Sequence, residues 1–344
     1  MLPTVPPRAA ISVVTVAYGP SPDLKACVAA CVASVGIDVE VVLVDNGGTE
    51  AIVDQIAREL PVIVVRPETN SGFAGGCNRG VAVAHNSLVA FINPDAIVEP
   101  EALEALARCL EDPTVGIATA ALLLADRPAL LNSGGNDVHF LGLSWAGKFE
   151  EPWSDHQNAV DVLAASGGAM MVRRDDFQRL GGFEEMFFAY FEDADLSIRM
   201  WLSGKSVRYV PTARVLHDYS FSKGDLKYFL VDRNRMLFAV RTFPLRWWVL
   251  LGPFFLLQEV GITALAVQQG WLRQRVESVS WMLRNRTAIR SCVQQSRSQR
   301  SVAISTVVTK FAEVIDPRNA PLPALVVRAQ WPMVRYWRLV SRWL

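Results

Sequence analysis

Short runs of β-branched residues alternate with segments of helical periodicity over the first quarter of the chain. Four of these runs predict buried strands, and each intervening segment is long enough for one helix. The runs are residues 11–18, 39–46, 62–66 and 88–95. This alternation is typical of an α/β fold built on a doubly wound, mostly parallel sheet.

A less regular pattern continues to residue 221. We expect strands at 115–124, 160–174 and 207–217, and helices at 175–183 and 191–204. Residues 131–152 are rich in turn-forming residues, which predicts short strands or a flexible loop. From residue 222 the pattern is helical. We therefore expect two units, an α/β domain over 1–221 and a helical region over 222–344.

The composition excludes several classes of protein. The 344 residues are 51% hydrophobic and include 34 basic and 34 acidic residues, unlike a disordered chain, a collagen-like repeat or a disulfide-stabilised miniprotein. The five cysteines form no CxxC pair, so we expect free thiols and a cytoplasmic protein. Prolines near the start also argue against a secretion signal.

The zero net charge conceals an asymmetry between the two ends of the chain. Residues 271–344 hold 13 basic and 3 acidic residues, whereas residues 1–270 hold 21 basic and 31 acidic residues. Seven of the ten tryptophans lie between residues 247 and 343. Arginine and tryptophan together are typical of an interface with anionic lipid or with nucleic acid. Nucleic-acid binding would rest on the basic tail alone, so we expect no nucleic-acid partner.

The C-terminal pattern favours a membrane surface. The apolar run 247–267 nearly reaches the length of a spanning helix, but Pro253 and Glu259 are among the residues that interrupt it. In a helical reading of residues 333–344, one stripe is apolar and another is basic. The apolar stripe is Met333, Tyr336, Trp337, Val340, Trp343 and Leu344, and the basic stripe is Arg335, Arg338 and Arg342. We expect this helix to hold the protein on the inner face of the cell membrane. The alternative is a helix packed on the catalytic domain or on a second subunit, with its arginines in solvent.

Acidic residues follow the predicted strands, where ligands bind in open α/β sheets. Asp45 comes directly after the second strand, and its carboxylate can accept the imide N–H of a uracil or thymine base. Asp is also a common turn residue, so Asp45 alone does not distinguish these roles. Asn93 and Asp95 follow the fourth strand around Pro94, an arrangement that suits either a divalent cation or an Asx turn.

A second acidic group begins the predicted helix at 191–204. Glu192, Asp193 and Asp195 are more carboxylates than helix capping requires. One of them can act as a general base for an attacking hydroxyl group. His217 ends the last predicted strand and becomes a metal ligand if that strand returns to Asp95; otherwise a lone histidine there is structural.

These segments resemble a known family. VVTVAYGP, VVLVDNGG, ETNSGFAGGCNRG, FINPDA, SGGAMMVRRDDFQRLGGFEEMFFAYFEDADLSIRMWLSG and VPTARVLHDYS occur in the order found in inverting glycosyltransferases of family two. The likeness covers residues 11–241 and is nearest to bacterial rhamnosyltransferase-like members, which act on polysaccharide or lipid-linked acceptors. It implies a GT-A fold, a nucleotide-sugar donor of the dTDP or UDP type, and Mg²⁺ or Mn²⁺.

The resemblance also assigns roles to residues. Asp95 takes the last position of the metal motif and His217 that of the metal-binding histidine. Asn93 stands where the full motif has an aspartate. Asp193 takes the position of the base, with Glu192 beside it as a supporting carboxylate. Donor-binding roles are implied for Ala17, Tyr18, Asp45, Asn70, Gly72, Asn93, Asp95 and Gly167.

One base without a nucleophilic carboxylate predicts a single displacement with inversion at the sugar C1. We expect transfer of a sugar, first of all rhamnose from dTDP-rhamnose, to a hydroxyl group of a lipid-linked or polysaccharide acceptor in cell-envelope glycan synthesis. The alternative is a non-catalytic nucleotide-sugar binding subunit of a membrane assembly, which would keep Asp45 and dispense with Asp193. Because both are present, the enzyme is favoured. The sequence predicts no oligomeric state.

Overall fold

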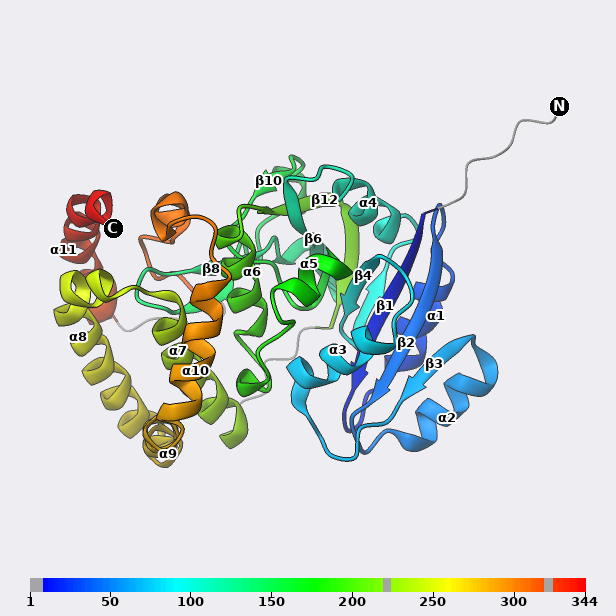
Figure 1. Ribbon diagram of the computed structural model, residues 1–344, viewed down its shortest axis with the longest axis horizontal. Coiled ribbons are helices and arrows are strands. Elements are labelled where there is room, and N and C mark those ends of the chain that lie inside the picture. Colours follow the sequence, from blue (N-terminus) through cyan, green and yellow to red (C-terminus); the bar gives the residue numbers. More distant parts are fainter. Residues whose placement is uncertain (1–8, 219–223, 319–323) are drawn as a thin grey trace.

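The computed structural model describes residues 9–218, 224–318 and 324–344. The predicted division between residues 221 and 222 therefore lies outside the described residues. So do residues 1–8, to which the expectation about a secretion signal applied. Figure 1 shows a sheet flanked by helices at one end of the molecule and a group of helices at the other.

The central sheet is mixed, and the strands from the N-terminal part of the chain run parallel within it. Its main path has the order β10-β12-β6-β11-β4-β1-β2-β3, with β5 paired to β12 and β7 to β6. The strands are β1 (Ala10–Ala17), β2 (Asp38–Asp45), β3 (Val62–Val65), β4 (Leu88–Ile92), β5 (Ala96–Val98), β6 (Val115–Leu124), β7 (Arg127–Ser133), β10 (Val160–Asp161), β11 (Ala169–Arg173) and β12 (Ser206–His217). A separate hairpin consists of β8 (Asn136–Val138) and β9 (Ser144–Ala146). The four strands predicted from the N-terminal pattern are confirmed as β1 to β4.

The pairing of the strands determines where a ligand can bind. β3, β2, β1 and β4 run parallel, so their carboxyl ends lie at one edge of the sheet. β11 runs antiparallel between β4 and β6, and β12 runs parallel to β6. β12 also pairs with β5, which brings His217 opposite Ala96, next to Asp95. The sheet thus brings together residues more than a hundred positions apart in the sequence.

Alternate residues of the strands face two hydrophobic cores. In β1, Val13 belongs to the core beneath α1, α2 and α4, whereas Val14 belongs to the core beneath α3, α5 and α6. Cys27 and Cys31 of α1 are buried in the first core, as predicted. The helices are α1 (Leu24–Val32), α2 (Glu50–Glu59), α3 (Gly72–Val83), α4 (Ala102–Cys109), α5 (Arg174–Arg179) and α6 (Glu192–Leu202).

The C-terminal helices form a third core with residues of the β8–β9 region. These helices are α7 (Asp225–Thr242), α8 (Leu245–Gln269), α9 (Leu272–Arg284), α10 (Arg286–Ser298) and α11 (Ala324–Val340). Trp247 is fully buried, and its indole N–H donates to the carbonyl of Phe140 at 2.9 Å. Glu259 of α8 pairs with Arg235 of α7 and Arg275 of α9. Partly buried ion pairs therefore join α8 to two neighbouring helices.

The structure corrects the prediction for the last helix. Met333, Trp337, Val340 and Leu344 are buried in this third core, and Trp337 stacks on Phe140 at 4.3 Å between ring centroids. Most of the stripe expected on lipid thus packs on the protein, although Trp343 is exposed. Among the basic residues, Arg338 pairs with Glu313. A helix that covers a protein core has the same apolar period as one that lies on a bilayer.

An exposed apolar face lies on α8 instead. Leu245, Val249, Leu256, Leu257, Val260 and Val267 are each more than half exposed and recur at helical spacing. By length and composition α8 is long and apolar enough to cross a membrane, with a mean hydropathy of 1.7, but an internal helix of a soluble protein can pass the same test. Its ion pairs through Glu259 join its other face to α7 and α9.

Candidate functional site

The carboxyl ends of β1 and β2 place the first predicted donor-binding residues side by side. Ala17 and Asp45 are partners in the parallel register, and Tyr18 is exposed just beyond them. Asp45 is only 4% exposed. Its Oδ1 accepts hydrogen bonds from Thr49 Oγ1 and from the Gly47 N–H, and its Oδ2 lies 3.3 Å from Arg66 Nε. In this arrangement Asp45 closes the turn between β2 and α2, and its contact with a base stays a prediction.

Asn70 and Gly72 form the entry to α3. Asn70 Oδ1 accepts a hydrogen bond from the Gly72 N–H at 2.8 Å and another from the side chain of Asn46 at 2.9 Å. Gly72 has a φ of +69°, and a Cβ there would lie 2.3 Å from the carbonyl oxygen of Phe188. Only glycine fits this position. The backbone before α3 therefore packs directly against the segment that leads to α6.

Asp95 and His217 meet at the end of β4. His217 Nε2 lies 3.3 Å from Asp95 Oδ1 and 3.5 Å from Asn93 Nδ2. His217 Nδ1 lies 2.9 Å from the side-chain oxygen of Asn132. The return of the last strand to Asp95, on which a metal role for His217 depended, is thus present in the structure.

The donor atoms at this point are suitable for a divalent cation. Asp95 Oδ1 is buried and accepts no hydrogen bond in the described structure. A carboxylate oxygen beside an imidazole nitrogen suits Mg²⁺ or Mn²⁺. No group of three His, Cys, Asp or Glu side chains that could hold a metal is found within the described residues. Two side chains leave coordination positions for phosphate oxygens and water, as is usual for Mg²⁺.

Asp193 lies at the start of α6, where backbone and side-chain donors reach its carboxylate. Its Oδ2 accepts hydrogen bonds from the Gly167 N–H and from Asn136 Nδ2, each at 2.9 Å. Burial raises the pKa of Asp193, and the hydrogen bonds from Gly167, Ala194 and Asn136 partly oppose this effect. A partly buried carboxylate with a raised pKa and a fixed orientation is suited to accept a proton.

The two other carboxylates of α6 have different surroundings. Glu192 Oε2 is buried without a hydrogen-bond partner in the described structure. Burial and then the charge of Asp193 raise the pKa of Glu192 well above its usual range. Asp195 pairs with Arg199 and Arg241. Burial acts to raise the pKa of Asp195, but these guanidinium groups outweigh it and hold the pKa below its usual value.

A strained segment precedes α6. Phe188, Tyr190 and Phe191 have φ values of +64°, +70° and +73°, which bulky residues rarely adopt. Asn234 of α7 is fully buried and donates hydrogen bonds to the carbonyls of Phe187, Ala189 and Tyr190. Arg233 donates to the carbonyls of Met186 and Phe187. Helix α7 thus fixes the backbone segment that leads to Asp193.

The two acidic centres are joined through the backbone of a glycine pair. The N–H of Asn93 donates to the carbonyl of Gly168 at 3.0 Å, and the N–H of the adjacent Gly167 donates to Asp193. A Cβ on Gly167 would lie 3.4 Å from Asp193 Oδ2. The predicted metal-binding loop and the predicted base therefore belong to one connected site.

Comparison with known proteins indicates the family of this chain. Residues 12–181 match the family described as glycosyl transferase family 2, and residues 160–222 match the N-terminal domain of galactosyltransferase. The chain is 28% identical to N-acetylglucosaminyl-diphospho-decaprenol L-rhamnosyltransferase of Mycobacterium tuberculosis, over 69% of this chain and 88% of that protein. This chain belongs to glycosyl transferase family 2. It is also 26% identical to rhamnosyltransferase WbbL of Escherichia coli, over 41% of this glycosyltransferase and 60% of WbbL.

Solved structures confirm the GT-A fold of this glycosyltransferase. A mannosyltransferase of Pyrobaculum calidifontis, solved with GDP-mannose and Mn²⁺, superposes with a TM-score of 0.53 at 16% identity, covering 86% of this chain and 88% of that one. GalNAc-T7, solved with UDP, GalNAc and Mn²⁺, gives a TM-score of 0.54 at 17% identity, covering 67% of this chain and 47% of that one. At these identities the likeness concerns the fold.

Four residues of the glycosyltransferase site were missed by sequence reasoning. Asn132, Asn136, Arg233 and Asn234 contact the predicted site residues or the segment before them. The asparagines at 132 and 136 lie in a segment whose turn formers predicted short strands or a flexible loop. Arg233 and Asn234 lie in the run DRNR, where four consecutive polar residues interrupt the apolar pattern of α7. All four residues of this run are buried, which no surface-helix pattern predicts.

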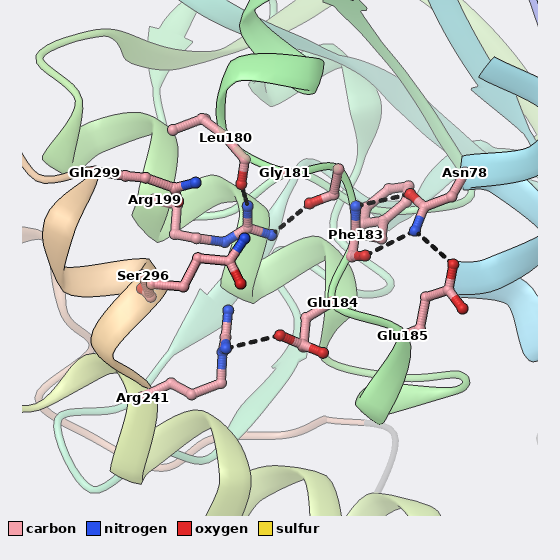
Figure 2. Close-up of a pocket in the computed structure, with 12 residues that line it drawn as sticks. Asn78, Leu180, Gly181, Phe183, Glu184, Glu185, Arg199, Arg241, Ser296 and Gln299 are labelled. Carbon is pink, nitrogen blue, oxygen red and sulfur yellow. Dashed lines mark hydrogen bonds and ion pairs between the residues drawn. The ribbon is translucent and has the colours of Figure 1, made fainter. Parts of the chain in front are cut away.

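A polar cavity of about 210 Å³ lies next to α6 and α10 (Figure 2). Arg199 and Arg241 line it, and both already pair with Asp195. Arg241 also pairs with Glu184, and Arg199 donates to the carbonyls of Leu180 and Gly182 (Figure 2). Asp95, Asp193 and His217 are not among its lining residues. The residues that line the cavity therefore hold α6 in place, and the cavity is separate from the candidate site.

Proposed function

We propose that this glycosyltransferase transfers a sugar, with inversion at C1, from a nucleoside diphosphate to a hydroxyl group of a lipid-linked or polysaccharide acceptor in cell-envelope glycan synthesis. The observation that carries the proposal is the carboxylate of Asp193. It is partly buried, oriented by Gly167 and Asn136, and connected through Gly168 to the loop of Asn93 and Asp95.

Asp193 acts as the general base. The acceptor hydroxyl group loses its proton to this carboxylate while its oxygen attacks C1 of the donor sugar. The bond between C1 and the diphosphate oxygen breaks in the same step, and the nucleoside diphosphate leaves with the bonding electrons. Glu192 supports the base as a neutral neighbour, since burial favours its protonated form.

Asp95 and His217 would hold Mg²⁺ or Mn²⁺. The bound cation would offset the negative charge of the departing diphosphate. Support comes from the buried Oδ1 of Asp95, which accepts no hydrogen bond among the described residues and lies beside the imidazole of His217. The two solved structures described above, both with Mn²⁺, add to this support.

The first donor proposed is dTDP-rhamnose. The relatives from Mycobacterium tuberculosis and Escherichia coli, both named as rhamnosyltransferases, support this choice of sugar. A pyrimidine base suits a carboxylate at the end of β2. Asp45 would accept the imide N–H through Oδ2, once its long contact with Arg66 rearranges.

The acceptor is proposed to be presented at the cytoplasmic face of the membrane, with the enzyme as a peripheral protein. The name of the mycobacterial relative includes a decaprenol diphosphate, which supports a lipid-linked acceptor. The exposed side chains of α8 supply an apolar face, and the exposed Arg246, Arg273 and Arg284 lie at its start and on the following helix. Such a pattern is typical of helices that lie on anionic lipid.

The test is an assay of the purified full chain with dTDP-, UDP- and GDP-sugars and a bacterial lipid extract as acceptor. We expect transfer with dTDP-rhamnose and Mn²⁺ or Mg²⁺, loss of transfer in excess EDTA, and inverted anomeric configuration by NMR. The Asp193→Asn variant is the matched control, because it preserves shape and removes the base. Transfer at the normal rate by this variant contradicts the proposed mechanism, and binding without transfer by the wild-type chain favours a non-catalytic subunit.

A further inference from the structure

Two asparagines of one short segment each contact a principal side chain of the site. Asn132 lies near the end of β7 and Asn136 begins β8, with a turn at residues 134–135 between them. Asn132 Oδ1 lies 2.9 Å from His217 Nδ1, and Asn136 Nδ2 donates to Asp193 Oδ2 at 2.9 Å. The segment thus reaches both the predicted metal ligand and the predicted base.

The contact with Asn132 determines which nitrogen of His217 faces Asp95. An amide oxygen only accepts hydrogen bonds, so the His217 proton lies on Nδ1. In the neutral imidazole that can bind a cation, Nε2 then carries the lone pair, and it lies 3.3 Å from Asp95 Oδ1. A hydrogen bond to the distal ring nitrogen commonly orients a metal-binding histidine and sets its tautomer.

The contact with Asn136 holds the carboxylate of Asp193 against rotation. Asn136 is itself fixed, because its N–H donates to the carbonyl of Ala164 at 2.8 Å and its Nδ2 also donates to the carbonyl of Ala165 at 3.1 Å. With the Gly167 N–H, it provides two donors to Asp193 Oδ2. The other oxygen accepts from the N–H of Ala194, the next residue of α6.

The turn between the two asparagines sets their spacing. Ser133 Oγ donates to the carbonyl of Gly135 at 2.7 Å. Gly135 has a φ of +97°, and a Cβ there would lie 3.0 Å from the carbonyl oxygen of Ala164. The left-handed backbone and the close approach both favour glycine. Asn132 is 3% exposed, so its amide is held inside the protein.

We propose that Asn132 and Asn136 are positioning residues for the transfer reaction. Asn132 orients His217 toward the cation, and Asn136 orients Asp193 toward the acceptor hydroxyl group. This inference rests on the proposed function and extends it by assigning the alignment of both centres to residues 132–136. A residue that only stabilises the fold would not separate cation binding from turnover, whereas these two residues do.

The experiment compares three variants with a matched control. Asn132→Ala removes the acceptor for His217, Asn132→Asp keeps an acceptor oxygen there, and Asn136→Ala removes a donor to Asp193. The control is Asn86→Ala, which loses one side-chain hydrogen bond, to Ser12, outside the site. Mn²⁺ affinity is measured by calorimetric titration of each protein with dTDP present, and kcat and KM for the donor are measured at saturating Mn²⁺.

We expect opposite patterns for the two positions. Asn132→Ala weakens Mn²⁺ binding by about 10- to 100-fold with kcat nearly unchanged at saturating Mn²⁺, and Asn132→Asp restores the affinity. Asn136→Ala lowers kcat by about 10- to 100-fold with donor KM and Mn²⁺ affinity nearly unchanged. Asn86→Ala changes none of these quantities.

Two results would overturn the inference: equal Mn²⁺ affinity for Asn132→Ala and the wild type, or a normal kcat for Asn136→Ala. If Asn132→Ala does not fold, Asn132→Ser replaces it, since its hydroxyl group is too short to reach His217. Mn²⁺ titration needs no turnover. A wild-type chain that binds Mn²⁺ without transferring sugar therefore contradicts the proposed function. The Mn²⁺ affinity of Asn132→Ala relative to the wild type still tests whether Asn132 orients His217.

Discussion

Glu192 and Asp193 are neighbours at the start of α6, yet they differ in the partners of their carboxylates. Asp193 accepts hydrogen bonds from Gly167 and Asn136, whereas Glu192 Oε2 is buried and accepts none in the described structure. Burial raises the pKa of both groups, and the charge of Asp193 raises that of Glu192 further. We infer that the shared proton lies on Glu192 and that Asp193 is the charged member of the pair.

The first prediction separates these two residues by activity. Asp193→Asn lowers kcat by roughly 100-fold or more, because the amide cannot accept the proton of the acceptor hydroxyl group. Glu192→Gln retains most of the activity, since its side chain stays neutral and of equal size. Steady-state kinetics at saturating donor measure both, and donor binding to Asp193→Asn shows that the site is intact. A larger loss for Glu192→Gln than for Asp193→Asn would reverse the assignment.

The second prediction concerns the pH dependence of stability. The pKa of Glu192 is higher in the folded than in the unfolded protein, so its stabilising contribution is complete below the unfolded value of about 4.3 and is lost as pH rises through the folded value. Glu192→Gln has no proton to lose. Its Tm therefore increases relative to that of the wild type as pH rises.

Thermal unfolding at several pH values between about 5 and 9 measures this difference. The control is Glu68→Gln, which removes an exposed carboxylate. We expect the Tm of the control to follow that of the wild type at every pH. A Tm difference for Glu192→Gln that stays constant across this range would show that Glu192 does not titrate there.

The third prediction concerns Asn234 and the strained segment before α6. Asn234→Ala removes the donor to three carbonyls and releases positive-φ residues at positions 188, 190 and 191. We expect the free energy of unfolding to fall by about 2–4 kcal/mol, since buried carbonyls lose their partners. We expect kcat to fall by at least about 10-fold, because Asp193 follows this segment directly.

Urea unfolding and steady-state kinetics measure the two effects. The control is Asn285→Ala, whose side chain donates to one carbonyl, that of Trp281 at the end of α9. Asn285→Ala should lower the free energy of unfolding by about 1 kcal/mol and leave kcat unchanged. Normal kcat in a folded Asn234→Ala variant would show that the strained segment does not position the base.

The sequence predicts the sheet well because burial there depends on local patterns. The β-branched runs became β1 to β4. Asp45 ends β2 and Asp95 follows β4, at the edge where parallel strands end. The prediction that His217 lies beside Asp95 was conditional, because it depended on the pairing of β12 with β5, which are more than a hundred residues apart. Local periodicity contains no information on such pairs.

The residues that hold the site in place were beyond prediction for the same reason. Asn132 contacts a residue 85 positions away, and Asn234 contacts carbonyls 44 to 47 positions away. Asn is common in turns and on helix surfaces, so neither position is unusual in a single sequence. The positive φ values before α6 are set by these contacts and are likewise not encoded in a local pattern.

The exposed apolar face of α8 leads to the fourth prediction. Leu256 and Leu257 are 67% and 61% exposed, while Trp337 of α11 is 2% exposed. The double variant Leu256→Asp/Leu257→Asp should weaken binding to anionic phospholipid vesicles by at least about 10-fold without lowering Tm, because charge is excluded from the acyl boundary. Trp337→Ala should instead destabilise the fold by about 3–5 kcal/mol, as loss of a buried aromatic side chain does.

Vesicle co-sedimentation at low salt, paired with thermal unfolding, distinguishes these two kinds of effect. The control is Val160→Asp, an exposed apolar residue at the edge of the sheet, which should bind vesicles like the wild type. Since exposed arginines lie at the start of α8 and on α9, binding should also weaken as salt rises or as anionic lipid is replaced by neutral lipid. If the α8 variant binds as strongly as the wild type, α8 does not contact the bilayer. If the wild-type chain does not bind anionic vesicles, we expect another protein surface to cover the exposed leucines and valines of α8.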